Sequence, residues 1–464
     1  MGRAFVLLFA MFTCVGAAAA QDAKPLDVKP LRQADDRYKA DILVVVAHPD
    51  DEAAATPYLA RVLDEGKHVA VAYGTRGSSG ENQSGSEQAA SLGAIREIEA
   101  RRSLAHFGVT NVWFLGGKDT ASQDVLQSLA NWDHGAALEN LVRIVRLTRP
   151  EVILTFLPGT FIGEDHGDHQ ASGVLATEAF DLAGNPAVFP AQVAAPLRRL
   201  EPYLENLQPW QPKKIYYFPD AEREDIFRDK GPAYSVKDIA KSSHKAYWRM
   251  ALEGFLAHQT QAKGYIDRLS KMSDAEIEKL AQTGWGDAQH FVLGKSLVGG
   301  SVIGDVFEGI TPGAIPFQHP ALVAEPQHPD LSVELAGPWN FYAQFRRAHA
   351  LTHLPHPEPP EIALQLGTTL VIPLWVRNAT ASSQEITMAA DLPSGWTLLS
   401  GTGRFSVAAK ETAAARVEID LPPLAENAPR KLDAQEITVR AESQGKSIGI
   451  VKLRVEPRKR SLPE

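Results

Sequence analysis

Residues 41–52 read D-I-L-V-V-V-A-H-P-D-D-E, an apolar run that ends in one imidazole and three carboxylates. The apolar part predicts a strand buried on both faces, as strands of parallel sheets are. Four titratable side chains follow it directly, namely His48, Asp50, Asp51 and Glu52. Charged groups beside a core are costly to desolvate unless something pairs with them, and a bound cation is the most direct partner. The stretch therefore predicts a parallel sheet with a metal site at its edge.

Length and charge set the class of protein. The chain has 464 residues, of which 44% are hydrophobic and 22% are charged, values typical of a globular protein with two or three domains. The formal net charge is −9, so there is no overall basic field to hold nucleic acid or an anionic membrane surface. We expect neither as a partner. The sequence leaves the oligomeric state open.

The first 20 residues have the pattern of a cleaved secretory signal peptide. Arg3 precedes an apolar stretch, and small residues stand at Ala18 and Ala20, before the expected cleavage point. An uncleaved anchor is the alternative, although the apolar stretch is barely long enough to span a bilayer. We expect an exported protein, periplasmic or extracellular, with no stable membrane insertion after cleavage. Because Cys14 is the single cysteine and lies in this segment, a metal site elsewhere must use His, Asp or Glu.

Short apolar runs alternate with helical patterns in the first part of the chain. The expected strands are residues 41–47, 67–75, 111–117 and 151–158, and the segments between them place apolar residues three and four apart, as amphipathic helices do. Such units form a Rossmann-like parallel sheet with helices on both faces, an α/β fold. Polar clusters follow each strand, and ligands of open α/β sheets bind outside the carboxyl ends of the strands. We therefore expect these clusters to meet at one edge.

The last part of the chain has a different pattern. Residues 311–360 are rich in proline and predict a connection. Residues 361–457 alternate apolar and polar side chains, with turn residues between the runs. This alternation predicts a C-terminal antiparallel β-sandwich domain.

His48, Asp51 and His169 form a plausible ligand set for a catalytic zinc ion. Two imidazoles and one carboxylate leave a coordination position open for water, as hydrolase zinc sites do. His48 and Asp51 follow the first strand, and His169 follows the fourth. Asp50 would remain free beside the metal-bound water, where a carboxylate can accept the proton of the attacking water.

The second cluster is H-G-D-H at residues 166–169. His166 stands three residues before a proposed ligand, so it can reach the reacting carbonyl and stabilise the oxyanion. Asp168 can orient or charge an imidazole from behind.

Other interpretations stay open at this point. Asp and His are common in solvated loops and helix N-caps, although two such clusters at the ends of two buried strands favour a site. The set His48, Asp50 and His169 also fits the two-His, one-carboxylate triad of a non-haem iron oxygenase, an enzyme class usually built on double-sheet barrels. A non-catalytic glycan-binding protein is a further alternative, against which stands the base, Asp50, beside a complete ligand set.

Several motifs, taken in order, resemble the PIG-L or LmbE-like family of zinc-dependent N-deacetylases. They are A-H-P-D-D-E, a T-R-G turn, the helix with Arg96 and Glu99, F-L-G-G-K-D, and H-G-D-H. The resemblance covers residues 38–310. It implies a hydrolase that removes an acetyl group from an N-acetylated sugar, typically N-acetylglucosamine within a glycoconjugate. It also implies one Zn²⁺ per chain, with Fe²⁺ or another divalent ion as the alternative.

The resemblance also implies roles for individual residues. The zinc ligands are His48, Asp51 and His169, the general base is Asp50, the oxyanion-assisting histidine is His166, and Asp168 is the partner of that histidine. Arg96 and Asp119 fall where the family contacts sugar hydroxyls.

Two further expectations come from looser likenesses. A-H-Q-T-Q, at residues 257–261, resembles a helix-end motif of longer relatives and implies that His258 lines the pocket. A histidine at that place can equally satisfy the last carbonyls of a helix. The C-terminal domain resembles the immunoglobulin-like domains appended to secreted carbohydrate enzymes, and we expect it to position the substrate or the catalytic domain without chemistry of its own.

Overall fold

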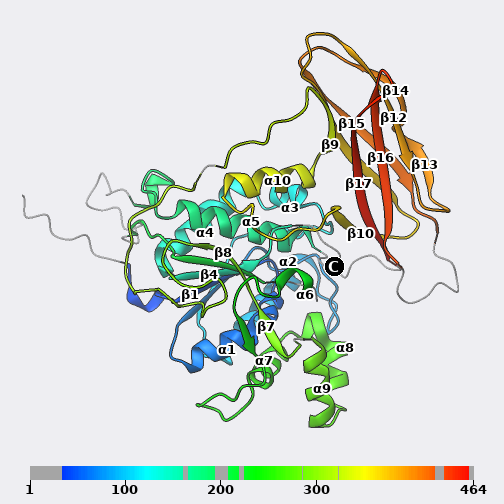
Figure 1. Ribbon diagram of the computed structural model, residues 1–464. Coiled ribbons are helices and arrows are strands. Elements are labelled where there is room, and N and C mark those ends of the chain that lie inside the picture. The colour runs from blue at the N-terminus through cyan, green and yellow to red at the C-terminus, as the bar shows by residue number, and fades with distance from the viewer. Residues whose placement is uncertain are drawn as a thin grey trace, which may run out of the picture.

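The computed structural model describes residues 34–159, 166–193, 207–218, 224–284, 286–321, 323–423 and 433–458. The expected signal peptide at residues 1–20 lies outside these ranges. Two parts are seen in Figure 1: an α/β unit, which holds the described residues up to 310, and a C-terminal β unit, which holds strands β9 to β17. Within the described residues, no helix is both long and apolar enough to cross a bilayer.

The α/β unit is organised around one mixed sheet. Its strands are β1 (Ile42–Val46), β2 (Val69–Tyr73), β3 (Asn111–Phe114), β4 (Val152–Phe156), β5 (Lys214–Phe218) and β8 (Val292–Ser296). They lie in the order β3-β2-β1-β4-β5-β8, with β8 antiparallel to β5 and the other neighbours parallel. The chain runs outward from β1 to β3 and returns to β4 on the other side of β1. The strand order therefore reverses between β1 and β4, the place where ligands bind in such sheets.

Helices cover both faces of this sheet. They are α1 (Thr56–Asp64), α2 (Ala89–Ala105), α3 (Val125–Asn131), α4 (His134–Thr148) and α5 (Gly167–Leu182). Because side chains alternate along a strand, Ile42 and Val44 join one core with α1 and α2. Leu43 and Val45 join the other core with α3, α4 and α5. The α/β layer with a predominantly parallel sheet, predicted from the apolar runs, is confirmed.

The chain between β5 and β8 is mostly helical. It contains α6 (Glu224–Phe227), β6 (Ala233–Ser235), α7 (Tyr247–Phe255), α8 (Gln259–Leu269), α9 (Asp274–Gly284) and β7 (Ala288–His290). β6 and β7 pair as a short antiparallel ladder. α7 packs against α1 and α2, and α8 packs against α2. The junction of α7 and α8 is thereby held beside α2. Three short 3-10 helices complete the unit, η1 (Asp36–Tyr38), η2 (Asp51–Ala54) and η3 (Pro190–Gln192).

The C-terminal β unit consists of two sheets. One has the order β10-β17-β16-β12-β14, and the other has the order β13-β15-β11-β9. The strands are β9 (Leu331–Leu335), β10 (Glu361–Gln365), β11 (Thr369–Asn378), β12 (Gln384–Asp391), β13 (Thr397–Ser400), β14 (Gly403–Val407), β15 (Glu411–Asp420), β16 (Gln435–Ser443) and β17 (Lys446–Arg458). Pairing is antiparallel except between β10 and β17. Apolar side chains of both sheets, among them Ile419 and Val439, form one shared core.

The segment expected as a connection, residues 311–360, holds regular structure of its own. Strand β9 pairs with β11 of the C-terminal β unit. Helix α10 (Pro338–Ala348), which follows it, lies over the α/β unit in Figure 1 and buries Tyr342 and Phe345 in the core shared with α3, α4 and α5. The two parts of the molecule are therefore joined by a packed helix.

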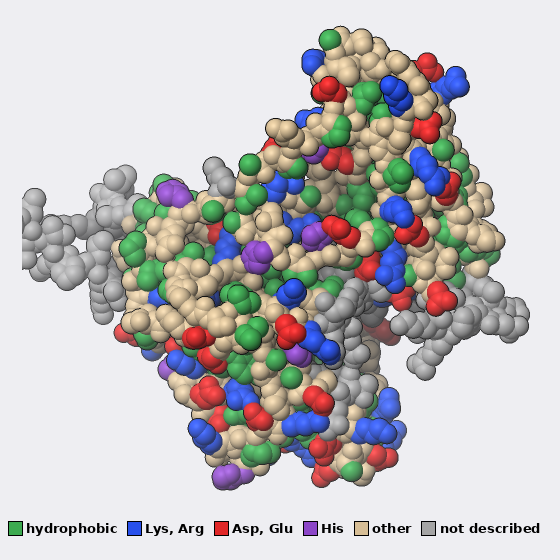
Figure 2. All heavy atoms as spheres, viewed as in Figure 1, with side chains coloured by type: hydrophobic (Ala, Val, Ile, Leu, Met, Phe, Trp, Pro, Cys, Tyr) green, Lys and Arg blue, Asp and Glu red, His purple; other side chains and the backbone are tan. Residues whose placement is uncertain are grey.

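Charged side chains of both signs are mixed on the visible surface. Figure 2 shows Lys and Arg interspersed with Asp and Glu over both units, with hydrophobic side chains scattered among them. On the described residues of this face no continuous basic surface is present, in keeping with the net charge of −9.

Candidate metal centre

The loop that follows β1 places Asp51 at the carboxyl edge of the sheet. Its Oδ2 accepts hydrogen bonds from the backbone N–H of Ala47, at 3.0 Å, and from that of His48, at 2.6 Å. The carboxylate therefore closes the turn that carries it, and Oδ1 faces Nε2 of His169 at 3.3 Å. A short-range interaction within the A-H-P-D-D-E motif thus orients one oxygen toward a residue more than a hundred positions away.

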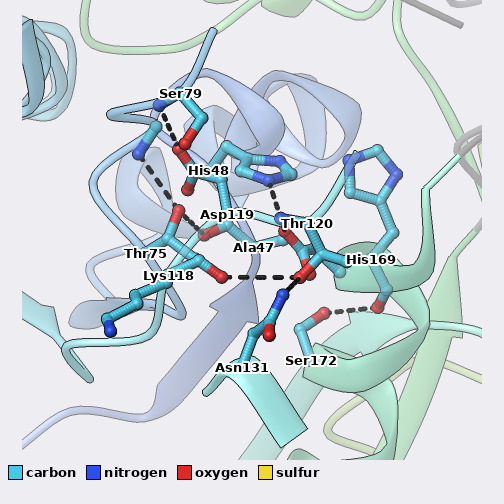
Figure 3. Close-up of polar contacts among 12 residues, drawn as sticks. Ala47, His48, Thr75, Ser79, Lys118, Asp119, Thr120, Asn131, His169 and Ser172 are labelled. Atoms are coloured by element: carbon cyan, nitrogen blue, oxygen red, sulfur yellow. Dashed lines mark hydrogen bonds and ion pairs between the residues drawn. The ribbon is translucent and has the colours of Figure 1, made fainter. Parts of the chain in front are cut away.

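His169 reaches the same point from the other side of the reversal. It lies in the first turn of α5, which follows β4 in the order of elements, and its ring stacks on Phe156, the last residue of β4, with centroids 4.5 Å apart and planes 17° apart. Ser172 donates a hydrogen bond to the backbone carbonyl of His169. Figure 3 shows the His48 and His169 rings on neighbouring elements above this contact. The aromatic contact and the helix together fix the imidazole.

The geometry of the three side chains fits a four-coordinate metal ion. Donor atoms of His48, Asp51 and His169 all lie within 4.8 Å of one another. Nδ1 of His48 is 3.5 Å from Asp51 Oδ2, and Nε2 of His169 is 3.3 Å from Asp51 Oδ1. Metal–ligand bonds of about 2.0–2.2 Å at tetrahedral angles place ligand atoms roughly 3.3–3.5 Å apart. Each imidazole lies at about that distance from one oxygen of Asp51, His48 from Oδ2 and His169 from Oδ1. Two imidazoles and one carboxylate are also the donor set that zinc prefers in catalytic sites.

The charges of His48 and Asp51 also favour a bound cation. Burial opposes a charge on His48, but Asp51 and Asp168 outweigh it and raise the pKa of this imidazole to about 10. Burial likewise opposes ionisation of Asp51, but His169 and His48 hold the pKa of its carboxyl well below the usual range. The anionic carboxylate of Asp51 thus lies between the imidazoles of His48 and His169 and favours a positive charge on them. A divalent cation would take the place of their protons, since metal ligands bind in the deprotonated form.

Asp168 forms the second polar contact of His48. Its Oδ2 lies 3.2 Å from Nε2 of His48 and accepts the N–H of Thr120 at 2.8 Å. Asp168 was expected to pair with His166, so this is a correction: the imidazole that it orients is His48. Donor atoms of His48, His166 and Asp168 lie within 4.8 Å of one another, and His166 Nδ1 is buried without a hydrogen-bond partner among the described residues.

His166 has the properties of a neutral imidazole. Burial, together with the charges of His48 and His169, lowers the pKa of His166 to about 4. It is the N-cap residue of α5, and its ring centroid lies 5.1 Å from that of His169. The three-residue spacing in H-G-D-H therefore does place His166 beside the proposed ligand, as the sequence indicated.

Asp50 occupies an unusual backbone conformation at the centre of the motif. Its φ is 105°, in the left-handed region that a residue with a side chain seldom adopts, and its N–H donates to Glu52 Oε2 at 3.0 Å. Burial and the charge of Asp51 raise the pKa of the Asp50 carboxyl to about 7, a value suited to a general base near neutral pH. Among the described residues, Asp50 belongs to neither group of metal-ligand geometry. The triad of His48, Asp50 and His169 expected for an iron oxygenase is therefore not formed.

Two residues expected to contact sugar hydroxyls have different surroundings. Arg96 is 4% exposed, and its guanidinium donates to the carbonyls of Gly77, at 2.5 Å, and Glu81, at 2.8 Å. Arg96 thus shapes the loop after β2, and its expected contact with a sugar hydroxyl stays a prediction. Asp119 Oδ2 accepts the N–H of Ser79 at 2.6 Å and joins the loops after β2 and β3, as Figure 3 shows, while its Oδ1 is buried without a partner among the described residues. The expected contact of Asp119 with a sugar hydroxyl stays a prediction.

His258 was expected to line the pocket, and its position corrects this expectation too. The side chain is 0% exposed, and its Nε2 lies 2.8 Å from Oε1 of Glu52. A fully buried imidazole paired with a buried carboxylate is not available to a substrate. Its partner, Glu52, and the backbone donor, Thr120, are site residues to which the sequence gave no role. Glu52 was visible in the motif, whereas Thr120 stands beside Asp119 with no signal of its own.

Comparisons with known proteins agree with this geometry. The family model described as PIG-L, GlcNAc-PI de-N-acetylase, matches residues 43–180, which include both site motifs. An enzyme of Thermobispora bispora named 1D-myo-inositol 2-acetamido-2-deoxy-alpha-D-glucopyranoside deacetylase is 30% identical over 194 residues, 38% of this chain and 58% of its own length. The enzyme of the same name from Streptomyces avermitilis is 31% identical over 38% of this chain and 60% of its own. The chain thus spans little more than half the length of these relatives.

Solved structures with lower similarity were also found. The N,N'-diacetylchitobiose deacetylase from Pyrococcus horikoshii is 18% identical, covering 55% of this chain and 84% of its own, with a TM-score of 0.36. A conserved protein from Thermus thermophilus is 22% identical, covering 56% of this chain and 96% of its own, with a TM-score of 0.35.

Proposed function

We propose that the α/β unit, with its PIG-L match at residues 43–180, is a metal-dependent hydrolase that removes the acetyl group from an N-acetylated sugar. One observation carries the proposal. His48, Asp51 and His169 converge from the ends of β1 and β4 with the spacing of metal ligands, and Asp50 stays outside that group. The names of the relatives, which are deacetylases of a glucosamine derivative, support an N-acetylglucosamine-type substrate.

The ligand set favours Zn²⁺, with Fe²⁺ or another divalent ion as the alternative occupant. When bound, such a cation supplies Lewis-acid polarisation of the acetamide carbonyl and lowers the pKa of water. His48, Asp51 and His169 would hold it, and Asp168 keeps the ring of His48 oriented through the 3.2 Å contact.

The remaining residues move protons and stabilise charge. Water oxygen bonds to the acetamide carbon while Asp50 accepts the proton that the water loses. His166 lies beside the ligand set and stabilises the negative charge that develops on the carbonyl oxygen. The C–N bond then breaks, the proton held by Asp50 passes to the departing nitrogen, and the products are acetate and a free amine.

Two further parts of the proposal concern the whole chain. We propose that the N-terminal 20 residues direct export, to the periplasm or the outside of the cell. We also propose that the C-terminal β unit is an immunoglobulin-like β-sandwich that positions the catalytic unit. Cell fractionation of the full chain and of a variant without residues 1–20 tests the first point, because retention of both in the cytoplasm would contradict export.

Acetate release tests the proposed reaction directly. The purified chain is loaded with Zn²⁺ and incubated with N-acetylglucosamine, its oligomers, and N-acetylglucosaminyl inositol, and released acetate is measured with and without a chelator. We expect acetate from at least one substrate, loss of activity with the chelator, and recovery when Zn²⁺ is restored. The deacetylated amine of each sugar serves as the blank.

The other possible results identify the rival functions. Glycan binding without acetate release in the metal-loaded protein would overturn the hydrolase in favour of a glycan-binding protein. Oxygen consumption with Fe²⁺, without acetate release, would overturn it in favour of an oxygenase.

A further inference from the structure

The carboxylate of Glu52 is buried directly behind the proposed base. Glu52 is 1% exposed, and its two oxygens have separate tasks. Oε2 accepts the backbone N–H of Asp50 at 3.0 Å. Oε1 accepts a hydrogen bond from Ser103 Oγ at 3.1 Å and pairs with His258 Nε2 at 2.8 Å. The side chain of Glu52 therefore joins the backbone of residues 48–53, here called the metal-site turn, to α2 and to the start of α8.

The hydrogen bond from the Asp50 N–H to Glu52 stabilises an unfavourable backbone conformation at Asp50. At φ 105° a residue with a side chain is strained, and such residues persist only where their surroundings hold them. The flanking turn is closed by Asp51 N–H to the His48 carbonyl, at 3.2 Å, and by Ala53 N–H to the Asp50 carbonyl, at 2.9 Å. The N–H of Asp50 itself points to Glu52. The direction of the Asp50 side chain thus depends on that carboxylate.

The segment that follows α7 secures Glu52 in turn. His258 is the N-cap residue of α8 and is 0% exposed. Two positions later, Thr260 donates its N–H and its hydroxyl to the buried carboxylate of Glu99 in α2, at 3.0 and 2.5 Å. The carbonyl of Thr260 accepts the N–H of Gln83, from the loop after β2, at 2.8 Å. Residues 258–260 therefore tie together the metal-site turn, α2 and a loop at the carboxyl edge.

We propose that Glu52 and His258 are positioning residues that set the orientation of Asp50 for proton transfer, while touching neither metal nor substrate. The inference rests on the proposed hydrolase and deepens it. It also gives the A-H-Q-T-Q segment a role, although this segment lies outside the range that the family model matches. Removing the imidazole leaves a buried carboxylate without its charged partner, and the carboxylate is then expected to move or to admit water.

The test compares His258→Ala, His258→Gln and the control His106→Ala in the full chain. His106 is also a histidine beside a carboxylate, 3.4 Å from Glu253, but its side chain is 39% exposed and its partner lies in α7 instead of beside Asp50. We expect His258→Ala to lower kcat by about 10- to 100-fold, the scale of a small misplacement of a reacting group. KM should stay within about threefold and the metal content should stay unchanged, because binding and coordination use other residues.

The conservative variant separates positioning from a general loss of structure. The Gln amide can still donate to Glu52, so His258→Gln should recover most of kcat, while His106→Ala should match the wild type. Loss of metal in His258→Ala, or equal loss of kcat in both His258 variants with lowered thermal stability, would overturn the proposal in favour of a structural pair.

Hydrogen–deuterium exchange gives a readout that needs no substrate. The amide of Asp50 should exchange faster in His258→Ala than in the wild type, and peptides spanning residues 47–55 report it. Unchanged exchange would overturn the positioning role of Glu52 and His258 even if the enzyme is active. If the wild type releases no acetate from any substrate, the proposed hydrolase fails. Faster exchange in the variant would still show that Glu52 and His258 hold the backbone of Asp50. The two failures are thus distinguished.

Discussion

The carboxyl ends of β1 and β4 bury charges, whereas the C-terminal β unit buries almost none. At the end of the α/β sheet, Glu52, Asp168 and His258 are 0–1% exposed. In the described part of the β unit from residue 361 on, Glu361 is the one charged side chain that is buried, and Arg454 pairs with it at 3.3 Å. Its shared core is otherwise apolar.

The contrast indicates which part of the protein keeps destabilising buried charges for a function. Buried ionised groups lower stability unless each is paired and hydrogen-bonded, so a fold keeps them where they have a task. In the α/β unit some buried charges pair elsewhere, such as Lys213 with Glu151, whereas Glu52, Asp168 and His258 gather near the carboxyl ends of β1 and β4. Three atoms near these ends, His166 Nδ1, Asp168 Oδ1 and Asp119 Oδ1, are buried without a partner among the described residues. We therefore expect substitutions in the α/β site to change chemistry and substitutions in the β core to change stability.

The largest effect should come from removing a ligand. His169→Ala takes away one of three donors and opens the gap beside Phe156, so metal affinity should fall by more than roughly a hundredfold, and hydrolysis with it. Metal content after dialysis, measured by mass spectrometry, checks this. His134→Ala is the control, because His134 pairs with Glu178 on the surface, away from the ligand group. A His169 variant that keeps its metal would break the assignment of the site.

Removal of the base should spare the metal. Asp50→Asn keeps the size of the side chain and lies outside the ligand group, so metal content should equal that of the wild type. Because a general base contributes about 10²–10⁴ in rate, kcat should fall by that factor. Single-turnover acetate release measures it. Equal loss of metal in Asp50→Asn and His169→Ala would show that the two residues share one role, contrary to the geometry.

Much of the α/β sheet and of the site at its edge could be predicted from the sequence. The apolar runs gave β1, β2, β3 and β4, and parallel strands with ligand sites at their carboxyl ends required the two polar clusters to meet. The i, i+3 spacing of His166 and His169 correctly placed both on one side of the start of α5. These predictions rest on local periodicity and on a topological rule, and both are readable along the chain.

The corrections and the missed contacts concern side-chain direction and distant partners. Donor atoms of His166 and Asp168 lie within 4.8 Å of each other, but the hydrogen bond of Asp168 goes to His48, 120 positions earlier in the chain. The pair of Glu52 and His258 joins positions 206 residues apart, which no local pattern encodes. Arg96 contacts carbonyls of a loop whose path depends on the folded backbone. Strand β9 was not predicted, since it is short and lies between a proline-rich stretch and the Gly-Pro start of α10.

A cavity in the C-terminal core should act on stability alone. Ile419 is 0% exposed at the centre of the shared core, so Ile419→Ala should lower the free energy of unfolding by about 2–5 kcal/mol. Metal content and kcat per folded molecule should not change, because the core lies in the unit without buried site charges. Chemical denaturation followed by assays of the folded fraction measures both. A selective fall in kcat would break the comparison and give the β unit a part in the chemistry.

The smallest expected effect lies where the two units meet. Gln123, in the loop between β3 and α3, accepts the N–H of Ala363 in β10 at 3.2 Å, and both residues are buried. Thr120, three positions earlier in the same loop, holds Asp168. Gln123→Ala should therefore cost about 1 kcal/mol of stability, the usual net value of one hydrogen bond, with kcat lowered by no more than about threefold. Thermal unfolding and acetate release measure the two effects, with Gln435→Ala, at the half-buried start of β16, as the control. A tenfold or greater fall in kcat would sharpen the comparison, because it would show that the β unit supports the site through this loop.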